Sequence, residues 1–572
     1  GGVLYYCLIP LVLRVDPRPA RGTDENGLVH LVQGPVLGHL DPTESFYAYY
    51  NIPYATVPTG IHRFKAPLPP PMWTQPLDAV DRGITCFQPA VFPNMREDCL
   101  VANVFVPNTN ETNLPVVVHI HGGAYQFGFG NSETLNSLVQ SKKIIAVTFN
   151  YRLGVHGFLC LGTEGAPGNA GLKDQVALLR WINENIDRFG GNPDDVTLLA
   201  CSAGAGATDV LTLSGITSGL YNKAILESGV SFGAVGVQVN PIENAKTYAR
   251  ILNFNNVDNV TALEEFYRTA SFQELLSRPD IMTDNTDSAI LFGPCVERDV
   301  GEERVLEDAP INIIKRGDYT KVPLLYGFAN MEGLMRTWLF ESWRHLMYEN
   351  FTIFLPAELG FESHEDKEEV ARTVKEFYFG NQYITGDNIL AFIDYFTDVL
   401  FGYPMLRALT LRVESLNDTI YLYKYSFVDE NTPSIPYTEE RGADHCEQAL
   451  AVLDEDETNI TAEYRQMKGV MRELWGNFIL TGSPVDPDSA LPSWPAASAA
   501  RSPHMSLGRS VELKGALLED RMAFWDTIYE RHYRAPVPPL VEDESTTGGA
   551  SSIGNLLLLN FLVSFIVAII FF

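Results

Sequence analysis

One serine stands where a strand is expected to turn sharply into a helix. The run from Leu198 to Gly206 reads Leu-Leu-Ala-Cys-Ser-Ala-Gly-Ala-Gly and places Ser202 among small residues. In a nucleophile elbow the residues two before and two after the serine must be small, so that strand and helix pack closely while the hydroxyl stands exposed. Gly204 meets this requirement, whereas Ala200 replaces the first glycine. The spacing indicates nucleophilic catalysis by Ser202, provided that the chain supplies a base, an acid and an oxyanion hole.

A candidate oxyanion hole lies upstream of this serine. The segment His121-Gly122-Gly123-Ala124 follows directly on the apolar run Val116–Ile120. An oxyanion hole needs backbone N–H groups that no side chain obstructs, and such glycines after a buried strand provide them. We expect the amides of Gly122, Gly123 and Ala203 to be the donors, the alternative being a plain glycine turn.

The base and the acid that orients it are expected after Ser202, because in hydrolases with this elbow the acid and then the histidine follow the serine along the chain. His445 lies in a polar, glycine-containing loop after a predicted strand, where a loop-borne catalytic residue is expected. Glu332 lies just beyond another predicted strand and would hold the imidazole tautomer. The alternatives are a loop histidine without chemistry and a glutamate that favours a helix start. Four further histidines lie beyond the serine in helical or surface-like segments: His345, His364, His504 and His532.

The elements that must position these residues read as strands alternating with helices. Apolar, β-branched runs predict strands at 116–120, 143–147, 196–199, 322–328 and 419–427. Apolar residues at helical spacing predict helices over 172–189 and 464–479. The order strand, helix, strand, elbow is that of a βαβ unit, so the predicted fold class is α/β with a large, mostly parallel central sheet flanked by helices. No phosphate loop and no metal-ligand spacing is found, so no metal and no cofactor is expected.

Composition narrows the class of partner. The 572 residues carry 71 acidic and 41 basic side chains, a formal net charge of −30. A nucleic-acid partner is excluded, because it would require a basic stripe. With no mid-chain linker and no internal repeat, we predict one catalytic domain over residues 21–535.

Both ends of the chain resemble targeting segments. Residues 1–20 contain an apolar run of the length found in signal peptides and are predicted to be a signal-peptide remnant, the alternative being a buried strand. Residues 536–552 are acidic and then small, and residues 553–572 are apolar. This pattern predicts a GPI-attachment signal, with attachment between Ser545 and Gly549, in preference to a tail anchor. We expect a secretory route ending outside the cell or on its surface.

Sequons and cysteines fit the same route. Five N-x-[ST] sequons are predicted glycosylation sites: Asn110, Asn259, Asn350, Asn417 and Asn459. Cys86 and Cys99 bracket a loop whose closure is worth about 3 kcal/mol, and we expect them to be bonded. Cys7 belongs to the signal peptide. Of the remaining four, Cys160 and Cys295 are expected to be inert core thiols. Cys201 and Cys446 adjoin candidate catalytic residues and would form a redox-sensitive pair if close together, but unlinked packing thiols are the preferred interpretation.

The ordered motifs resemble those of the type-B carboxylesterases, the cholinesterase-like α/β-hydrolases, and most of all the insect carboxylesterases. The resemblance spans about residues 25 to 534 and rests on these segments: Glu97–Leu100, His121–Ala124, Asn150–Gly154, Gly168–Gln175, Phe189–Pro193, Ser202–Gly204, Asn330–Gly333 and Gly442–His445. It implies the α/β-hydrolase fold, the Cys86–Cys99 disulfide and a structural ion pair between Glu97 and Arg152. It also implies a serine esterase that hydrolyses small to medium apolar carboxylic esters (xenobiotic, odorant or lipid-derived) through an acyl-enzyme.

Two positions depart from the family. Ala200 is usually glycine, and Cys201 is glutamate in cholinesterases and glutamine in typical juvenile hormone esterases. The loop between Cys86 and Cys99 contains Phe87 and Phe92 but no Trp for a cation–π seat, which disfavours a cholinesterase. The alternative function is a cell-surface, cholinesterase-like adhesion protein, because some such ectodomains have lost the serine. Retention of Ser202, Glu332 and His445 favours the enzyme.

Overall fold

Neighbouring residues of each central strand face opposite sides of one large sheet. In the computed structural model, which describes residues 27–540 except 90–91, 279–283 and 455–456, Val116 and Val118 belong to one hydrophobic core, whereas Val117 belongs to a second core. The two cores cover the two faces of the sheet, because successive side chains of a strand point to opposite sides. Strands buried on both faces explain the continuous β-branched runs in the sequence.

Within the described residues, eleven strands form the main sheet, and two smaller sheets lie in the N-terminal part. The spatial order of the main sheet is β16 (Val511–Lys514), β15 (His504–Leu507), β14 (Ile420–Tyr425), β13 (Leu324–Ala329), β12 (Lys223–Glu227), β11 (Gly191–Cys201), β9 (Leu114–Ile120), β10 (Ile145–Phe149), β8 (Val101–Pro107), β4 (Phe46–Pro53) and β3 (His39–Leu40). The small sheets contain β1 (Leu28–His30), β2 (Pro35–Leu37) and β5 (Leu77–Asp78), and β6 (Thr85–Cys86) and β7 (Met95–Arg96).

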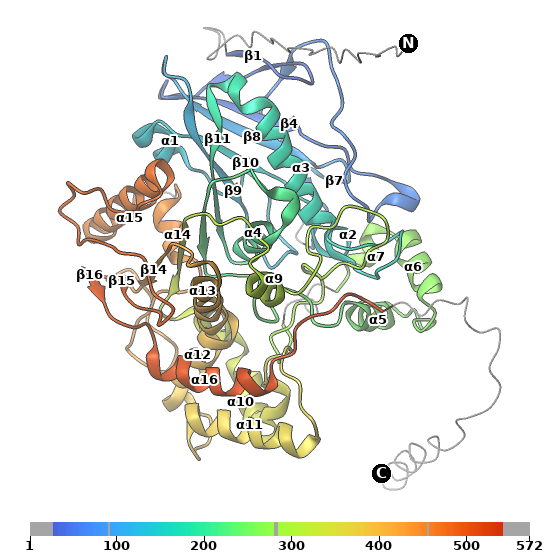
Figure 1. Ribbon diagram of the computed structural model, residues 1–572, viewed down its shortest axis with the longest axis vertical. Coiled ribbons are helices and arrows are strands. Elements are labelled where there is room, and N and C mark those ends of the chain that lie inside the picture. Colours follow the sequence, from blue (N-terminus) through green and yellow to red (C-terminus); the bar gives the residue numbers. More distant parts are fainter. Residues whose placement is uncertain (1–26, 90–91, 279–283, 455–456, 541–572) are drawn as a thin grey trace, which may run out of the picture. The chain divides into compact units, whose positions relative to one another are not determined.

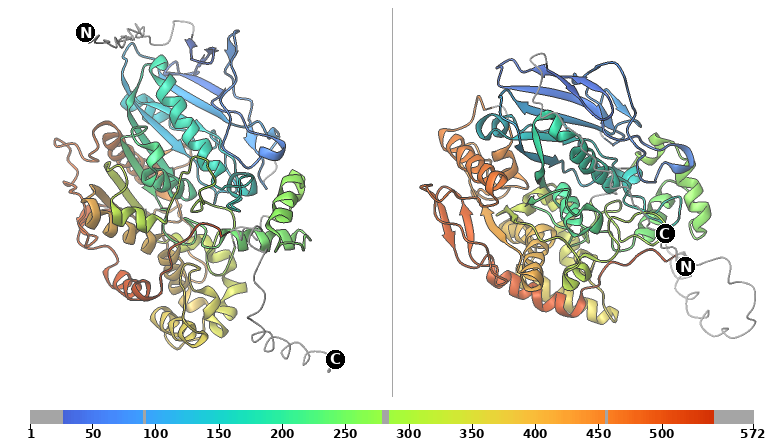
Figure 2. Two further views of the ribbon diagram at one scale, coloured as in Figure 1. Left: turned by 45° about the vertical axis from the view of Figure 1, so that its right-hand side comes forward. Right: turned by 45° about the horizontal axis from the view of Figure 1, so that its top comes forward.

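The centre of the main sheet is parallel and its edges are antiparallel. Every neighbouring pair from β15 to β10 is parallel, while β16 and the N-terminal strands β8, β4 and β3 pair in the antiparallel sense. The N-terminal strands, blue in Figure 1, form one edge, and the C-terminal strands form the other (Figure 2). The α/β class and the mostly parallel sheet are confirmed. The carboxyl ends of all the parallel strands lie at the same end of the sheet, where loop residues from distant parts of the chain can assemble a site.

Helices cover both faces of the sheet. Residues of α3, α4, α13 and α16 belong to the first core, and residues of α1, α14 and α15 belong to the second; α3 and α4 can be followed in Figure 1. The helices are α1 (Asn136–Lys142), α2 (Gly154–Phe158), α3 (Ala170–Asn185), α4 (Ala203–Leu213), α5 (Pro241–Ile251), α6 (Val260–Thr269), α7 (Phe272–Leu275), α9 (Pro310–Arg316), α10 (Phe340–Glu349), α11 (His364–Phe379), α12 (Ile389–Thr397), α13 (Tyr403–Leu416), α14 (Glu447–Val452), α15 (Ala462–Thr481) and α16 (Glu519–His532). The helices expected over 172–189 and 464–479 are α3, which a 3₁₀ turn extends to Phe189, and α15.

A long helical run lies inside this architecture. The stretch Gly386–Leu416, which contains α12 and α13, is long and apolar enough to cross a membrane, yet 83% of its most apolar window is buried inside the fold. Such a run is typical of a core helix in a globular domain. Its middle is a π-helical turn at Asp398–Gly402, a feature that is frequent at functional sites.

The cysteine prediction needs correction. Cys86 and Cys99 are bonded as expected, but Cys160 and Cys295, expected to be unlinked thiols, form a second disulfide with a Cα–Cα distance of 6.7 Å. Gly168 makes room for it, because a Cβ there would lie 2.5 Å from the sulfur of Cys295. Their separation of 135 residues explains why no local signal indicated the pair.

The expected ion pair of Arg152 with Glu97 is wrong. Arg152 instead pairs with Asp174 on α3, through Nε at 2.8 Å and Nη2 at 2.7 Å, and its backbone N–H donates to the same carboxylate. Both side chains are buried. The fork of the guanidinium matches a carboxylate that it can grip with two parallel hydrogen bonds, and α3 presents Asp174 in that position.

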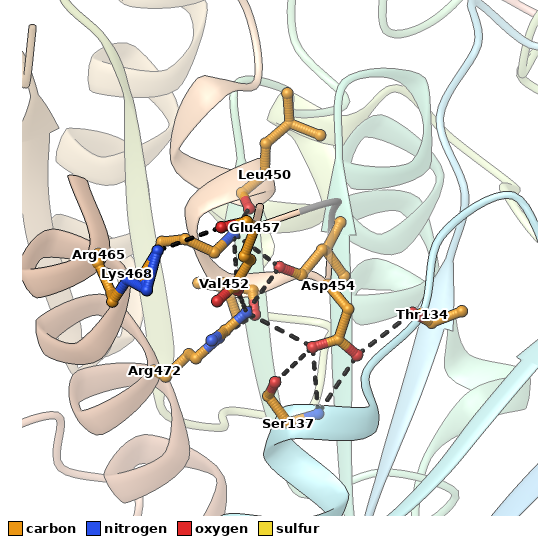
Figure 3. A network of polar contacts seen from close by, with 10 residues as sticks. Thr134, Ser137, Leu450, Val452, Asp454, Glu457, Arg465, Lys468 and Arg472 are labelled. Atoms are coloured by element: carbon orange, nitrogen blue, oxygen red, sulfur yellow. Dashed lines mark hydrogen bonds and ion pairs between the residues drawn. The ribbon is translucent and has the colours of Figure 1, made fainter. Parts of the chain in front are cut away.

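A polar network fastens the segment after α14 to two neighbouring helices (Figure 3). Asp454 accepts hydrogen bonds from the backbone N–H and hydroxyl of Ser137 on α1, and Arg472 on α15 donates to Asp454 and to Glu457. Lys468, also on α15, donates to the carbonyl oxygens at the end of α14. The network holds the C-terminal end of α14 in place.

Three predicted segments lie wholly or mostly outside the described residues. They are the signal-peptide remnant (1–20), the linker (536–552), of which residues up to 540 are described, and the apolar tail (553–572). All five predicted glycosylation sites are described, and each of these asparagines is exposed.

Candidate active site

The backbone at Ser202 has the conformation of a nucleophile elbow. Ser202 follows the last residue of β11 and precedes the first residue of α4, with φ 60° and ψ −131°. A non-glycine residue in this region is strained, and such strain persists where the surrounding structure enforces it. A Cβ at Gly204 would lie 2.2 Å from the backbone oxygen of Ile120, so this position requires glycine. Ala200, the irregular member, is fully buried in β11 and keeps its ladder pairing with β12 and β9.

The structure brings Ser202, His445 and Glu332 together in one hydrogen-bonded row. Nε2 of His445 lies 2.8 Å from Oγ of Ser202, and Nδ1 of His445 lies 2.5 Å from Oε2 of Glu332. A carboxylate accepts only, so Nδ1 carries the proton and Nε2 faces the serine hydroxyl as an acceptor. The three residues follow β11, β14 and β13 respectively, at the carboxyl ends of parallel strands. The row has the geometry needed to take a proton from the serine.

The carboxylate of Glu332 is buried and fully engaged. Besides His445 it accepts hydrogen bonds from the backbone N–H of Ala329 at 2.7 Å and from the hydroxyl of Ser228. The hydroxyl of Ser228 in turn accepts from Nε2 of Gln448. Buried charges are tolerated when hydrogen bonds satisfy them. Ser228 and Gln448 thus fix the carboxylate that orients the imidazole.

Ser228 and Gln448 were not among the residues that the sequence indicated. The signal for Ser228 is its place directly after β12, at the same end of the sheet as the other site residues. The strand Lys223–Glu227 was not predicted, so that signal was missed. Gln448 carries no signal in the sequence, because its contact with Ser228 joins residues 220 positions apart.

Two side-chain hydrogen bonds anchor the glycine loop beside Ser202. Nδ1 of His121 donates to the carbonyl oxygen of Gly122 at 2.8 Å, and the hydroxyl of Tyr151 donates to the carbonyl oxygen of His121. Burial lowers the pKa of His121 to about 4, so the ring stays neutral. In a trans peptide the N–H points opposite to the preceding carbonyl, so holding the oxygen of Gly122 directs the N–H of Gly123 away from His121.

Gly122 itself must lack a side chain. A Cβ at this position would lie 2.8 Å from the carbonyl oxygen of Cys201 and 3.2 Å from Cβ of Ser202. The first N–H groups of a helix have no intrahelical partner, so the amide of Ala203, the first residue of α4, is available as well. Gly122, Gly123 and Ala203 all line the cavity around Ser202.

The cavity at Ser202 has a volume of about 470 Å³. Its walls are mainly small and apolar, and the charged side chains of Glu133, Asp284 and Arg336 also line it. Arg336 lies 3.0 Å from Asp284, and Glu133 lies 3.1 Å from Nε2 of His119. The apolar lining includes Val230, Val235, Ile290, Trp338, Leu400 and Phe401. This volume fits a small to medium ligand.

A disulfide lies beside the hydrogen-bonded row. Cys201 and Cys446, for which unlinked thiols were the preferred interpretation, are bonded, with their Cα atoms 6.2 Å apart. That interpretation is wrong because the fold brings the end of β11 and the start of α14 within disulfide range. Both cysteines line the cavity. The even number of cysteines left after Cys7 is set aside was the signal available in the sequence.

Comparison with known proteins agrees with this site. A family model described as the carboxylesterase family matches residues 25–525. The chain belongs to the carboxylesterase family. A carboxylic ester hydrolase of Bombus ignitus is 30% identical to this carboxylesterase over 84% of the chain and 90% of the relative. A juvenile hormone esterase of Heliothis virescens is 32% identical over 79% of the chain and 84% of the relative.

Solved structures support the same assignment. The crystal structure of juvenile hormone esterase from Manduca sexta, with OTFP covalently attached, has a TM-score of 0.78 and 29% identity, and covers 88% of this carboxylesterase and 99% of that chain. A PNB esterase has a TM-score of 0.68 and 28% identity. This carboxylesterase has the α/β-hydrolase fold and hydrolyses carboxylic esters. The adhesion alternative has no observation in its favour.

Proposed function

We propose that the carboxylesterase acts through an acyl-enzyme formed on Ser202. The observation that supports this proposal is the row Ser202–His445–Glu332 beside the glycine loop. Oγ of Ser202 attacks the ester carbonyl while Nε2 of His445 takes its proton and then gives it to the leaving alcohol. Water then attacks the acyl-enzyme, with His445 taking a proton from the water and returning one to Ser202. Glu332 stabilises the imidazolium without accepting its proton.

The oxyanion of each tetrahedral intermediate would be held by the amides of Gly122, Gly123 and Ala203. Donors that are already aimed at the developing charge need no rearrangement during the reaction. The anchoring of the glycine loop by His121 supports this role, because it fixes the peptide that carries the second donor.

The substrates would be small to medium apolar esters, of xenobiotic, odorant or lipid-derived origin. The cavity volume and the apolar side chains that line it support this class. Cholinesterases carry a glutamate at the position of Cys201. In this protein Cys201 is part of a disulfide, so it provides no negative charge for an ester whose alcohol group is a cation.

The decisive experiment compares the wild type with Ser202→Ala. Hydrolysis of 1-naphthyl acetate is expected in the wild type and loss by at least about 10⁴-fold in the variant. Ser214→Ala is the matched control, since Ser214 is a buried serine whose hydroxyl has no hydrogen bond to the described residues. A fluorophosphonate should label the wild type once per chain, on the peptide that contains Ser202. Equal turnover by the wild type and Ser202→Ala would refute the mechanism.

We also propose that the protein follows the secretory route and is held at the cell surface by a GPI anchor. Three disulfides support an oxidising compartment, and the exposure of the five sequon asparagines allows glycosylation. Treatment of intact expressing cells with phosphatidylinositol-specific phospholipase C should release the esterase, and peptide N-glycosidase should lower its apparent mass. Retention of the esterase on phospholipase-treated cells would favour the tail anchor.

A further inference from the structure

The disulfide Cys201–Cys446 joins the two segments that carry the nucleophile and the base. Cys201 is the last residue of β11 and directly precedes Ser202, and Cys446 directly follows His445 at the start of α14. The two cysteines are 245 positions apart in the chain. One covalent bond therefore spans the same gap as the hydrogen bond between His445 and Ser202.

One sulfur of this disulfide lies against the side of the His445 ring that faces Ser202. Sγ of Cys446 lies 3.6 Å from Nε2 of His445, the nitrogen that faces the hydroxyl of Ser202. A disulfide sulfur carries no hydrogen, so it packs against the ring without donating to Nε2. A free thiol in that place would be a weak donor and, once ionised, a second partner for an imidazolium.

The other hydrogen bonds of the His445 loop lead away from Ser202. This loop connects β14 with α14 and covers residues 426–446. Ala443 exchanges hydrogen bonds with Asn330 and Met331, which follow β13. Just beyond the loop, Gln448 on α14 donates to Ser228, which follows β12. Among the described residues, the disulfide is the covalent tie between this loop and β11. The Glu332–His445 half of the row thus has supports of its own, whereas the disulfide joins the His445 segment to the end of β11 directly beside Ser202.

We propose that the disulfide Cys201–Cys446 is a positioning crosslink that holds Nε2 of His445 at hydrogen-bond distance from Ser202, so that thiol reduction slows the esterase. This inference rests on the proposed acyl-enzyme mechanism. Cys446 is the more exposed of the two cysteines. A dithiol attacks it through one thiolate, which breaks the bond to Cys201, and the second thiol then closes a cyclic disulfide as Cys446 leaves. The dithiol supplies two electrons and two protons, and both cysteines end as thiols.

Loss of the crosslink should lower kcat and leave KM almost unchanged. A base that is displaced by about 1 Å can cost 100-fold in rate, whereas the walls that bind the ester remain in place. We expect Cys201→Ala/Cys446→Ala to reduce kcat by about 10- to 100-fold with KM within about threefold of the wild type. The matched control is Cys160→Ala/Cys295→Ala, which removes another buried disulfide that does not line the cavity. It should lower the Tm and keep kcat.

Reduction of the folded wild type tests the proposal without a variant. Dithiothreitol should lower kcat in step with the reduction of Cys201 and Cys446, which is followed by alkylating withdrawn samples with iodoacetamide and reading the peptides by mass spectrometry. Removal of the dithiothreitol and reoxidation of the unlabelled enzyme with diamide should restore kcat. Cys201→Ala/Cys446→Ala should not respond, while the Cys160→Ala/Cys295→Ala control should respond like the wild type.

Two outcomes would overturn the crosslink: wild-type kcat in a folded Cys201→Ala/Cys446→Ala protein, or full kcat after both thiols are alkylated. Ser202→Ala is measured in the same series to separate the two proposals. If Ser202→Ala is inactive while reduction has no effect, only the crosslink fails. If Ser202→Ala is active, the mechanism itself fails.

Discussion

Phe401 stacks on His445, with ring centroids 4.4 Å apart and an angle of 17° between the ring planes. Phe401 belongs to the π-helical turn Asp398–Gly402 and also lines the cavity. The helical segment between β13 and β14 therefore supports the base from the face of its ring, while Glu332 holds its edge.

Replacement of this ring should slow catalysis. We expect Phe401→Ala to lower kcat by about 2- to 10-fold, because a stacked pair is worth about 0.5–1.5 kcal/mol beyond its burial. The measurement is kcat for 1-naphthyl acetate over a range of pH. Phe377→Ala is the control, since Phe377 stacks on Phe524 at the surface, with 42% of its area exposed. Equal kcat values for the two variants would mean that the stack does not position His445.

Removal of the Ser228 hydroxyl should lower both the free energy of unfolding and kcat. Ser228→Ala deletes a donor to the buried carboxylate of Glu332, and it leaves Nε2 of Gln448 without its acceptor. We expect a loss of about 1–3 kcal/mol in the free energy of unfolding, measured in urea, together with a lower kcat. The buried Ser214→Ala, which breaks no hydrogen bond to the described residues, should change kcat little. An unchanged kcat in Ser228→Ala would contradict the role assigned to it.

A methyl group at position 122 should weaken stabilisation of the transition state more than it weakens substrate binding. The Cβ would press on Cys201 and Ser202 and displace the amides of the glycine loop. We expect Gly122→Ala to reduce kcat by about 10²–10³-fold, the cost of losing one oxyanion donor, with a small change in KM. Gly469→Ala serves as the control. Gly469 lies on the long helix α15, and a Cβ at this position would meet nothing within 4 Å. This variant should raise the Tm slightly.

Burial of Glu227 should make stability depend on pH. Burial raises the pKa of Glu227 to about 8, although Trp475 and Tyr423 donate hydrogen bonds to its carboxylate. Between its ordinary pKa of 4.5 and about 8 the folded state holds a proton that the unfolded state has lost, so this group's contribution to stability falls as pH rises. The slope approaches about 1.4 kcal/mol per pH unit within that window.

The slope can be read from urea unfolding at pH 5, 6, 7 and 8. Glu227→Gln should flatten the decline, while Glu184→Gln, at an exposed position on α3, should retain it. If Glu227→Gln and the wild type decline equally, another group carries the dependence.

The sequence indicated the site residues that adjoin the end of a predicted strand, whereas Ser228 was missed because its strand, β12, was not predicted. Ser202, Glu332 and the glycine loop stand within a few residues of apolar runs that are β11, β13 and β9. His445 stands farther from its strand, but a polar glycine-containing loop still marked it. In each case local geometry restricts the residue type, so the signal is local as well.

What the sequence did not indicate depends on contacts across the fold. The bond between Cys201 and Cys446 and the pairing of Arg152 with Asp174 are decided by which elements come to lie side by side. The sequence does not encode such neighbours at any fixed spacing. The same holds for Phe401, whose place over His445 depends on a π-helical turn.

The order in which the ribosome makes the chain gives the distant disulfides a further consequence. Cys201 emerges 245 residues before its partner, a delay of roughly 12–50 s at about 5–20 residues per second. Cys160 likewise emerges 135 residues before its partner Cys295. During synthesis these two early thiols are each other's nearest available partners, so a growing chain that oxidises too soon joins the wrong pair. We therefore expect the yield of active enzyme to rise with the supply of a thiol-exchange catalyst that reopens such bonds before Cys446 is made.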